Sequence, residues 1–255
     1  MSKGYAVITG ASSGIGTEFA KRLAKEGYRL VLVARRKERL KKLAQELNTE
    51  CLIISADLSN MNECKRIMQE LDSVEIDVFI NNAGFGYCGE TLSIDTETEL
   101  NMIDLNVKAT HLLAKLVLDK MVAKNKGYVL NVASSAGLLP AGPYMSTYYA
   151  TKAYVTSYTR GLAEELRRRN SDVYVGCLCP GPVDTEFNKV ANVEFALKGI
   201  SAYTCASYAI TQMFKKKITI VPAFKMKALV VLAKFIPTKL YIRIAAKQQR
   251  KKFYR

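Results

Sequence analysis

The sequence predicts an α/β fold in which a doubly wound parallel sheet lies between two layers of helices, a three-layer α/β/α arrangement. Short apolar runs that suit buried strands alternate with helical patterns along most of the chain. A glycine-rich turn joins the first apolar run to the first helical pattern. The 255 residues, 49% hydrophobic and 24% charged, are enough for one large domain with a full core.

The first expected element is a strand at residues 5–9, because the run YAVIT is apolar and of strand length. It leads into the glycine-rich residues 10–16, and a helical pattern with Phe19, Leu23 and Ala24 on one side follows. Glycines at such a turn let the backbone approach a ligand and leave helix N-terminal N–H groups available to pyrophosphate. The alternative is a tight turn without a ligand.

The second expected strand, residues 30–34, ends at Arg35 and Arg36. An acidic residue at this place would bind the ribose 2′-hydroxyl of NAD, whereas arginine suits a 2′-phosphate. The pair therefore predicts NADP(H). The alternative is that both arginines only solvate the start of the charged helix expected at residues 37–47.

The same alternation predicts the remaining elements. We expect strands at residues 51–55, 77–80, 128–132, 173–178 and 218–222, and helices at about 62–71 and 148–169. The fourth strand runs into the segment NNAG at residues 81–84, and the fifth runs into Ser134 and Ser135.

Tyr148 and Lys152 stand four residues apart on an expected helix, so both side chains point into the same space. A cation close to a phenol oxygen favours the phenolate, so we expect Lys152 to lower the pKa of Tyr148 and to make its hydroxyl a proton donor and acceptor. Tyr149 cannot replace Tyr148, because Ala153 stands four residues beyond it. Taken alone, the pair would rather indicate a packed aromatic ring and a solvated charge, and the upstream motifs reverse this interpretation.

The cysteines and the single histidine favour no metal site. The six cysteines form neither C-x-x-C pairs nor zinc-ligand spacing, and only His111 could assist them. We expect reduced thiols, a structural His111 and a cytoplasmic protein. An apolar strand follows close after Met1, so we expect no signal or transit peptide.

The net charge of +15 is concentrated in the tail. Residues 215–255 carry 13 Lys and Arg and no acidic residue, which leaves 25 basic and 23 acidic residues, or +2, for the rest. The apolar run at 224–236 is interrupted by three lysines and is too short to span a bilayer. We expect a basic helical extension at 223–255 that packs on or near the substrate cleft of the same domain. The alternative is an amphipathic element on an anionic membrane surface. Nothing beyond charge suggests nucleic acid.

Seven motifs occur together in order: T-G-x-x-x-G-x-G, A-D-L, N-N-A-G, a helix bearing Asn106, a Ser-Ser pair after a strand, Y-x-x-x-K and P-G-x-V-x-T. In this combination the chain resembles the short-chain dehydrogenase/reductase family, over residues 3–185. In motif spelling it is most similar to the branch of hydroxysteroid dehydrogenases and long-chain 3-ketoacyl reductases. The resemblance implies a Rossmann-like catalytic domain that binds NADP(H) at residues 1–222.

The resemblance also implies roles for individual residues. The catalytic residues would be Asn106, which holds a water in a proton relay, Ser134, Tyr148 and Lys152. Ser135 is the alternative to Ser134, because the usual separation from the tyrosine favours it. The cofactor would be bound by Gly10, Ser12, Ser13, Gly14, Ile15, Gly16, Arg35, Asp57, Leu58, Asn81, Ala83, Gly84, Tyr148, Lys152, Pro180, Gly181, Val183 and Thr185.

Two further expectations follow from the resemblance. Residues 187–197 would form an apolar lid over the substrate, with core packing as the alternative for Phe187, Val190, Val193, Phe195 and Leu197. The helix of Tyr148 and its predecessor would build the interface of a homodimer or homotetramer. The expected function is reversible hydride transfer between NADP(H) and a carbonyl or alcohol, on an apolar ketone such as a steroid or ketoacyl compound. The alternative is an NADPH-binding regulator or membrane-surface adaptor without turnover.

Overall fold

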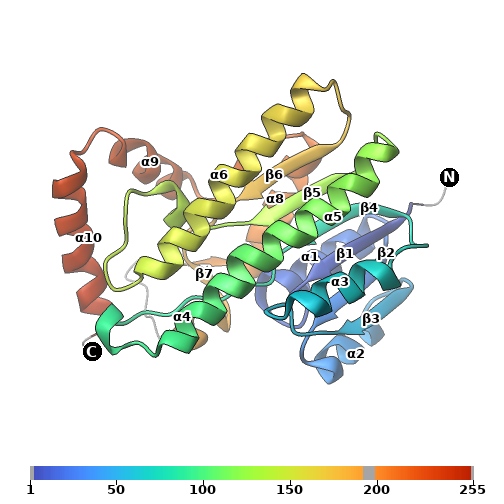
Figure 1. The fold of residues 1–255 in the computed structure, drawn as a ribbon, viewed down its shortest axis with the longest axis horizontal. Coiled ribbons are helices and arrows are strands. Elements are labelled where there is room, and N and C mark those ends of the chain that lie inside the picture. Colours follow the sequence, from blue (N-terminus) through green and yellow to red (C-terminus); the bar gives the residue numbers. More distant parts are fainter. Residues whose placement is uncertain (1–2, 192–198, 254–255) are drawn as a thin grey trace.

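The computed structural model describes residues 3–191 and 199–253, and it confirms the predicted fold class. A parallel sheet of seven strands, in the order β3-β2-β1-β4-β5-β6-β9, has helices on both faces (Figure 1). The strand order reverses between β1 and β4, which pair with each other. In open α/β sheets, ligands bind beyond the carboxyl ends of the strands at such a reversal.

The strands of the sheet are β1 (Tyr5–Thr9), β2 (Arg29–Ala34), β3 (Cys51–Ser55), β4 (Ile76–Asn81), β5 (Tyr128–Val132), β6 (Tyr174–Leu178) and β9 (Thr219–Ile220). A separate pair is formed by β7 (Val183–Asp184) and β8 (Ile200–Ser201). The helices are α1 (Gly14–Lys25), α2 (Lys37–Glu46), α3 (Met61–Glu70), α4 (Thr96–Ile103), α5 (Thr110–Ala123), α6 (Ser146–Arg168), α7 (Phe187–Val190), α8 (Ala202–Phe214), α9 (Phe224–Ala233) and α10 (Thr238–Phe253). Short helical turns lie at η1 (Thr91–Ser93), η2 (Asp104–Ala109) and η3 (Ser135–Leu138).

Alternate residues of the central strands pack on opposite faces of the sheet. Ile8 joins the cluster under α1, α2 and α8, which includes the fully buried Phe19. Its neighbour Val7 joins the cluster under α3, α5 and α6, together with Phe79. Both faces of β1 are therefore covered, as the apolar run predicted, and this rigid sheet holds the loops at its carboxyl edge.

The last strand is shorter than predicted. We expected residues 218–222, but β9 is Thr219–Ile220 and pairs only with Cys177 and Leu178 of β6. It lies at the edge of the sheet, and Pro222 has no N–H to donate to a longer ladder. The other strand predictions differ from the structure by one residue at most.

Beyond the sheet, α9 and α10 form a helical pair beside the amino-terminal half of α6 (Figure 1). In α9 the buried side chains are Met226, Val230 and Ala233. A Cβ at Gly181 would lie 2.7 Å from Cε of Met226, so α9 packs directly over the loop that follows β6. In the part of the chain that the structure describes, no helix is both long and apolar enough to cross a membrane.

Candidate active site

A cleft with a cavity volume of about 370 Å³ lies at the carboxyl edge of the sheet. It is lined by most of the residues that the sequence singled out, and they come from seven segments of the chain. The predicted residues that line it are Gly10, Ser12, Ser13, Gly14, Ile15, Arg35, Asp57, Leu58, Ala83, Gly84, Ser134, Tyr148, Lys152, Pro180, Gly181, Val183 and Thr185. One cleft thus joins the expected phosphate loop to the expected catalytic side chains.

The turn between β1 and α1 requires glycine at two positions. Gly10 and Gly14 have φ of 68° and 57°, a region that side chains rarely adopt. At the start of α1, the Ser13 side chain makes no capping hydrogen bond, and no acidic residue stands in the first turn. The first N–H groups of α1 therefore have no side-chain cap and lie where the cleft begins. This arrangement fits a cofactor pyrophosphate.

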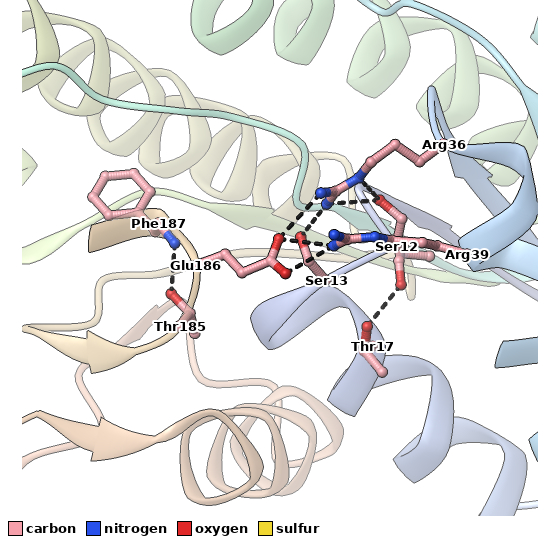
Figure 2. Close-up of polar contacts among 9 residues, drawn as sticks. Ser12, Ser13, Thr17, Arg36, Arg39, Thr185, Glu186 and Phe187 are labelled. Atoms are coloured by element: carbon pink, nitrogen blue, oxygen red, sulfur yellow. Dashed lines mark hydrogen bonds and ion pairs between the residues drawn. The ribbon is translucent and has the colours of Figure 1, made fainter. Parts of the chain in front are cut away.

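Two arginines from the start of α2 extend over this loop (Figure 2). Arg36 Nη2 donates to Ser13 Oγ at 2.9 Å and to Ser12 Oγ at 3.3 Å. Arg36 Nη1 also donates to a carboxylate oxygen of Glu186 at 3.1 Å, and Arg39 Nη1 donates to both oxygens at 2.8 and 2.9 Å. Glu186 follows β7 and is far from the arginines in sequence. These contacts create a cationic site beside the phosphate loop.

The predicted Arg35 also lines the cleft, but its contacts differ from those of Arg36. Its guanidinium lies 3.9 Å from a carboxylate oxygen of Asp57, and the side chain is 69% exposed. Arg36, which was predicted with Arg35 as a pair but was not assigned to the cofactor site by the resemblance, is the one bonded to the two predicted loop serines. Arg39 and Glu186 were not predicted at all. A basic residue one helical turn beyond Arg35 was the available signal for Arg39.

Tyr148 and Lys152 lie on α6 at the other end of the cleft, and both are buried. Lys152 Nζ donates to the carbonyl of Val132 at 3.0 Å and lies 5.9 Å from the centre of the Tyr148 ring. The Ser134 side chain hydrogen-bonds the Tyr148 phenol and also accepts from the Ala136 N–H at 3.1 Å. Ser135 also lines the cleft, and its N–H donates to the carbonyl of Pro180 at 2.8 Å.

Burial controls the pKa of both groups. It raises the pKa of the Tyr148 phenol to about 12, and the hydrogen bond with Ser134 opposes this rise only in part. Burial lowers the pKa of the Lys152 ammonium to about 8. The expected lowering of the Tyr148 pKa by Lys152 is therefore wrong for this structure. Desolvation of the phenolate outweighs a cation at that distance from the ring.

Asn106 lies in the π-helical turn η2 and is fully buried. Its Nδ2 donates to the carbonyl of Phe85 at 2.8 Å and to Thr151 Oγ1 at 3.1 Å, and its Oδ1 accepts from the Phe85 N–H at 3.0 Å. A Cβ at Gly84 would lie 2.8 Å from Asn106 Oδ1 and 3.2 Å from Lys152 Nζ. Asn106 therefore fixes the loop after β4 against α6, and Gly84 leaves room for Lys152 beside it. Its expected hold on a relay water stays a prediction.

Two other predicted residues lie outside the lining of the cleft. Asn81 is buried and donates from Nδ2 to the carbonyl of Thr110 at 2.9 Å, so it supports the floor of the site. Gly16 lies within α1, where a Cβ would come 2.2 Å from the carbonyl oxygen of Gly10. Its lack of a side chain allows the helix to pack on the turn.

The start of the expected lid lies over Tyr148. Phe187 and Val190 line the cleft, and the Phe187 ring centre is 5.6 Å from that of Tyr148. Val193, Phe195 and Leu197 lie outside the described residues. Gln249 of α10, which the sequence did not single out, also lines the cleft and donates to Tyr149 Oη at 3.0 Å. The tail thus contributes a side chain to the catalytic end.

The histidine lies apart from this chemistry. His111 Nδ1 lies 2.8 Å from Tyr154 Oη on the outer side of α5 and α6, and its ring stacks on Tyr158. Within the described residues, no group of three His, Cys, Asp or Glu side chains could hold a metal ion.

The family model described as short chain dehydrogenase matches residues 4–195, about three quarters of the chain. The chain belongs to the short-chain dehydrogenase family. The very-long-chain 3-oxoacyl-CoA reductase of Anas platyrhynchos is 34% identical over 200 residues, which cover 75% of this chain and 63% of that relative. This chain thus spans less than two thirds of the length of that relative.

Two solved structures share the fold of this short-chain dehydrogenase. One from Sphingobium yanoikuyae, in complex with NADPH, has a TM-score of 0.81 at 30% identity and covers 91% of this chain and 94% of its own. Another from Burkholderia phymatum, in complex with NAD, has a TM-score of 0.82 at 25% identity, with 90% and 92% covered. The two neighbours thus hold different nicotinamide cofactors in the same fold.

Proposed function

We propose that this protein is an NADP(H)-dependent reductase of an apolar ketone. The observation that carries the cofactor choice is the pair Arg36 and Arg39, whose guanidiniums meet beside Ser12 and Ser13 of the phosphate loop. A 2′-phosphate in this position would receive several charge-assisted hydrogen bonds, which the 2′-hydroxyl of NAD could not use as well. Since NADPH is the usual reductant in cells, reduction is the proposed direction.

In the proposed mechanism the bound cofactor supplies a hydride to the carbonyl carbon. The Ser134 hydroxyl hydrogen-bonds the substrate oxygen and steadies the charge that develops there. Tyr148 donates its phenol proton to the same oxygen. That phenol is protonated at neutral pH, and burial raises its pKa further, to about 12. The hydrogen bond between Ser134 and Tyr148 favours Ser134 over Ser135 in this role.

Lys152 and Asn106 support the proton donor. Burial lowers the pKa of Lys152 to about 8, so its ammonium can exchange a proton near neutral pH and help to reprotonate Tyr148. Asn106 positions Lys152 indirectly, since it holds Phe85 and Thr151 in place on either side. Thr151 Oγ1 in turn donates to the carbonyl of Tyr148 at 2.8 Å.

Apolar side chains at the catalytic end support a bulky apolar substrate. Phe85, Met145, Tyr149, Phe187 and Val190 line the cleft around Tyr148. A similar relative is named for a very-long-chain 3-oxoacyl-CoA, which carries a ketone on a long apolar chain. We therefore propose ketoacyl or steroid-like ketones as the substrate class.

The test is NADPH oxidation by the purified protein with ketosteroids, 3-ketoacyl thioesters, quinones and short aldehydes, with NADH in parallel. We expect turnover of one bulky ketone class with NADPH. Tyr148→Phe should abolish this turnover and retain NADPH binding, because it removes only the hydroxyl. Tight NADPH binding with no turnover on any carbonyl, together with an unchanged cellular phenotype for Tyr148→Phe, would support the non-catalytic regulator instead.

We also propose that the tail contacts an anionic membrane surface through α9. Its outward side carries Phe224, Ala228 and Val231, at a spacing that keeps them on one face of the helix, and Phe235 in the turn after the helix continues this apolar stripe. Phe224 and Phe235 are 84% and 81% exposed. The buried side chains of α9 lie on the opposite side, so the stripe does not serve the core.

The charges beside this stripe favour lipid over a second copy of the chain. Lys225, Lys227 and Lys234 flank the stripe, and residues 215–255 contain no acidic side chain. Two copies that met through this face would bring lysines together without compensation, whereas anionic headgroups would neutralise them. A surface helix of this kind could also collect apolar substrates from the bilayer.

Sedimentation with liposomes tests this contact. Phe224→Ser combined with Phe235→Ser should reduce binding to vesicles that contain phosphatidylserine, and salt should weaken binding of the wild type. Leu92→Ser is the matched control, because Leu92 is a fully exposed apolar side chain in η1, which is distant from α9 in the sequence. Equal sedimentation of all three proteins would exclude α9 as the contact.

For assembly, we propose a homo-oligomer that pairs through the outer side of α5 and α6. Tyr154 is 39% exposed there and stacks with Tyr158. Light scattering after gel filtration, with Tyr154→Arg as the disruptive variant, measures the oligomeric state directly.

A further inference from the structure

Glu186 holds the two arginines that the cofactor phosphate needs. Its carboxylate accepts hydrogen bonds from Arg36 and Arg39 at 2.8 to 3.1 Å, and these bonds lower its pKa. Arg36 at the same time touches both serines of the phosphate loop (Figure 2). The carboxylate therefore lies at the place where a 2′-phosphate beside that loop would find its cations.

A carboxylate and a phosphate are interchangeable ligands for guanidinium groups, since both present paired anionic oxygens to the N–H fork. We infer that Glu186 is an internal competitor for the 2′-phosphate of NADP(H), and that phosphate and carboxylate exchange on Arg36 and Arg39. This inference rests on the proposed NADP(H)-dependent function.

The exchange is feasible because all three side chains are about half exposed. Exposed ion pairs are weak, so a phosphate dianion can displace the carboxylate without a large penalty. NAD(H) has no phosphate at this position and would leave the pairs of Glu186 intact. Glu186 should therefore weaken the binding of NADP(H) selectively, and reduce the preference for NADP(H) over NAD(H).

The neighbours of Glu186 connect this exchange to the rest of the cleft. Thr185 packs against the phosphate loop, because a Cβ at Gly14 would lie 3.2 Å from its Cβ. On the other side, Phe187 packs against the ring of Tyr148. Three consecutive residues thus contact the phosphate loop, the arginines and the proton donor.

The experiment measures dissociation constants of NADP⁺, NAD⁺ and 2′,5′-ADP by calorimetry for the wild type and for Glu186→Gln. We expect Glu186→Gln to lower the dissociation constants of NADP⁺ and 2′,5′-ADP by roughly three- to tenfold. The dissociation constant of NAD⁺ should change by less than about twofold. In an Arg39→Ala background the same substitution should have a smaller effect, because one of the two contested cations is gone.

Glu38→Gln is the matched control for charge. Glu38 lies on the same helix as Arg39, pairs with Lys41 at 2.9 Å and is 81% exposed. If Glu38→Gln tightened the binding of NADP⁺ and 2′,5′-ADP as much as Glu186→Gln does, the effect would come from a general change of electrostatic potential. The inference that Glu186 is a competitor would then be overturned. Equal NADP⁺ affinity for wild type and Glu186→Gln would overturn the inference that Glu186 competes with the 2′-phosphate. It would not affect the proposed function. Failure of both proteins to bind NADP⁺ or 2′,5′-ADP would overturn both.

Discussion

Replacement of Lys152 by methionine should stabilise the fold at neutral pH although it removes a residue of the site. Lys152 is 5% exposed, and burial lowers the pKa of its ammonium from 10.5 to about 8. This shift corresponds to about 3 kcal/mol of lost stability while the lysine is protonated in both folded and unfolded states. Methionine also loses the hydrogen bond to Val132, worth about 1 kcal/mol, so we expect a net gain of about 2 kcal/mol near pH 7.

The gain should depend on pH with a defined sign. A folded-state pKa below the unfolded value means that the penalty is complete below about pH 8 and disappears as the pH rises to about 10.5. The advantage of Lys152→Met should therefore shrink over this window and change sign before its upper end, where only the loss of the hydrogen bond to Val132 remains. Tyr148, whose pKa burial raises to about 12, destabilises the fold above about pH 10 in both proteins, so it cancels in the difference.

Urea unfolding of wild type and Lys152→Met at about pH 7 and about pH 10 measures this difference. In a thermal scan near pH 7 we expect a rise of about 4–8 °C. Lys124→Met, at an exposed position after α5, is the control for loss of a lysine and should change little. Equal or lower stability of Lys152→Met at neutral pH, or a gain that does not change with pH, would refute the account of Lys152 as a buried, strained cation.

Two further substitutions test the loop after β4. Gly84→Ala should lower turnover at least tenfold, because the added Cβ would lie 3.2 Å from Lys152 Nζ and 2.8 Å from Asn106 Oδ1. Gly161→Ala on the same helix as Lys152 meets nothing within 4 Å and should leave turnover unchanged, so equal activity of the two variants contradicts the crowding argument. Asn106→Ala should destabilise the fold by about 2–4 kcal/mol, because it empties a fully buried position and the part-buried N–H and carbonyl of Phe85 lose their partner. A loss below about 1 kcal/mol in urea unfolding would show that water replaces the side chain.

Much of the sheet could be predicted because its strands are buried on both faces and end at recognisable turns. The bounds of β1, β3 and β5 agree with the predicted strands residue for residue. The expected phosphate loop and Ser134 reach one cleft, since they follow the carboxyl ends of parallel strands, and α6 brings Tyr148 and Lys152 to the same cleft. Local pattern is sufficient there, because topology alone brings those ends together.

The details of the cationic end could not be predicted in the same way. Adjacent residues after a strand point in different directions, so the sequence cannot tell whether Arg35 or Arg36 turns toward the phosphate loop. The partner of Arg36 and Arg39 is Glu186, about 150 residues away, and it carries no motif of its own. Gln249 reaches the cleft from even further along the chain, and only the packing of α10 reveals it.

The direction of the Tyr148 pKa shift was missed for a related reason. Spacing on a helix shows that Tyr148 and Lys152 share a face, but the balance between charge attraction and desolvation depends on surroundings that come from distant segments. Phe187 packs on the Tyr148 ring, and a Cβ at Gly86 would lie 2.9 Å from the same ring. Such enclosure penalises the phenolate more than a nearby ammonium favours it.

The two ends of the cleft therefore differ in how far their ionisable groups are exposed to water. At the arginine end the ionised groups are half exposed, so water screens them and one anion can replace another. At the catalytic end Tyr148 and Lys152 are buried, and burial moves both pKa values toward the neutral forms. This division matches a cofactor that carries phosphate charge at its adenosine end. At the other end such a cofactor reacts with an uncharged ketone. Residues 185–187 contact both ends, so a substitution there tests recognition and chemistry together.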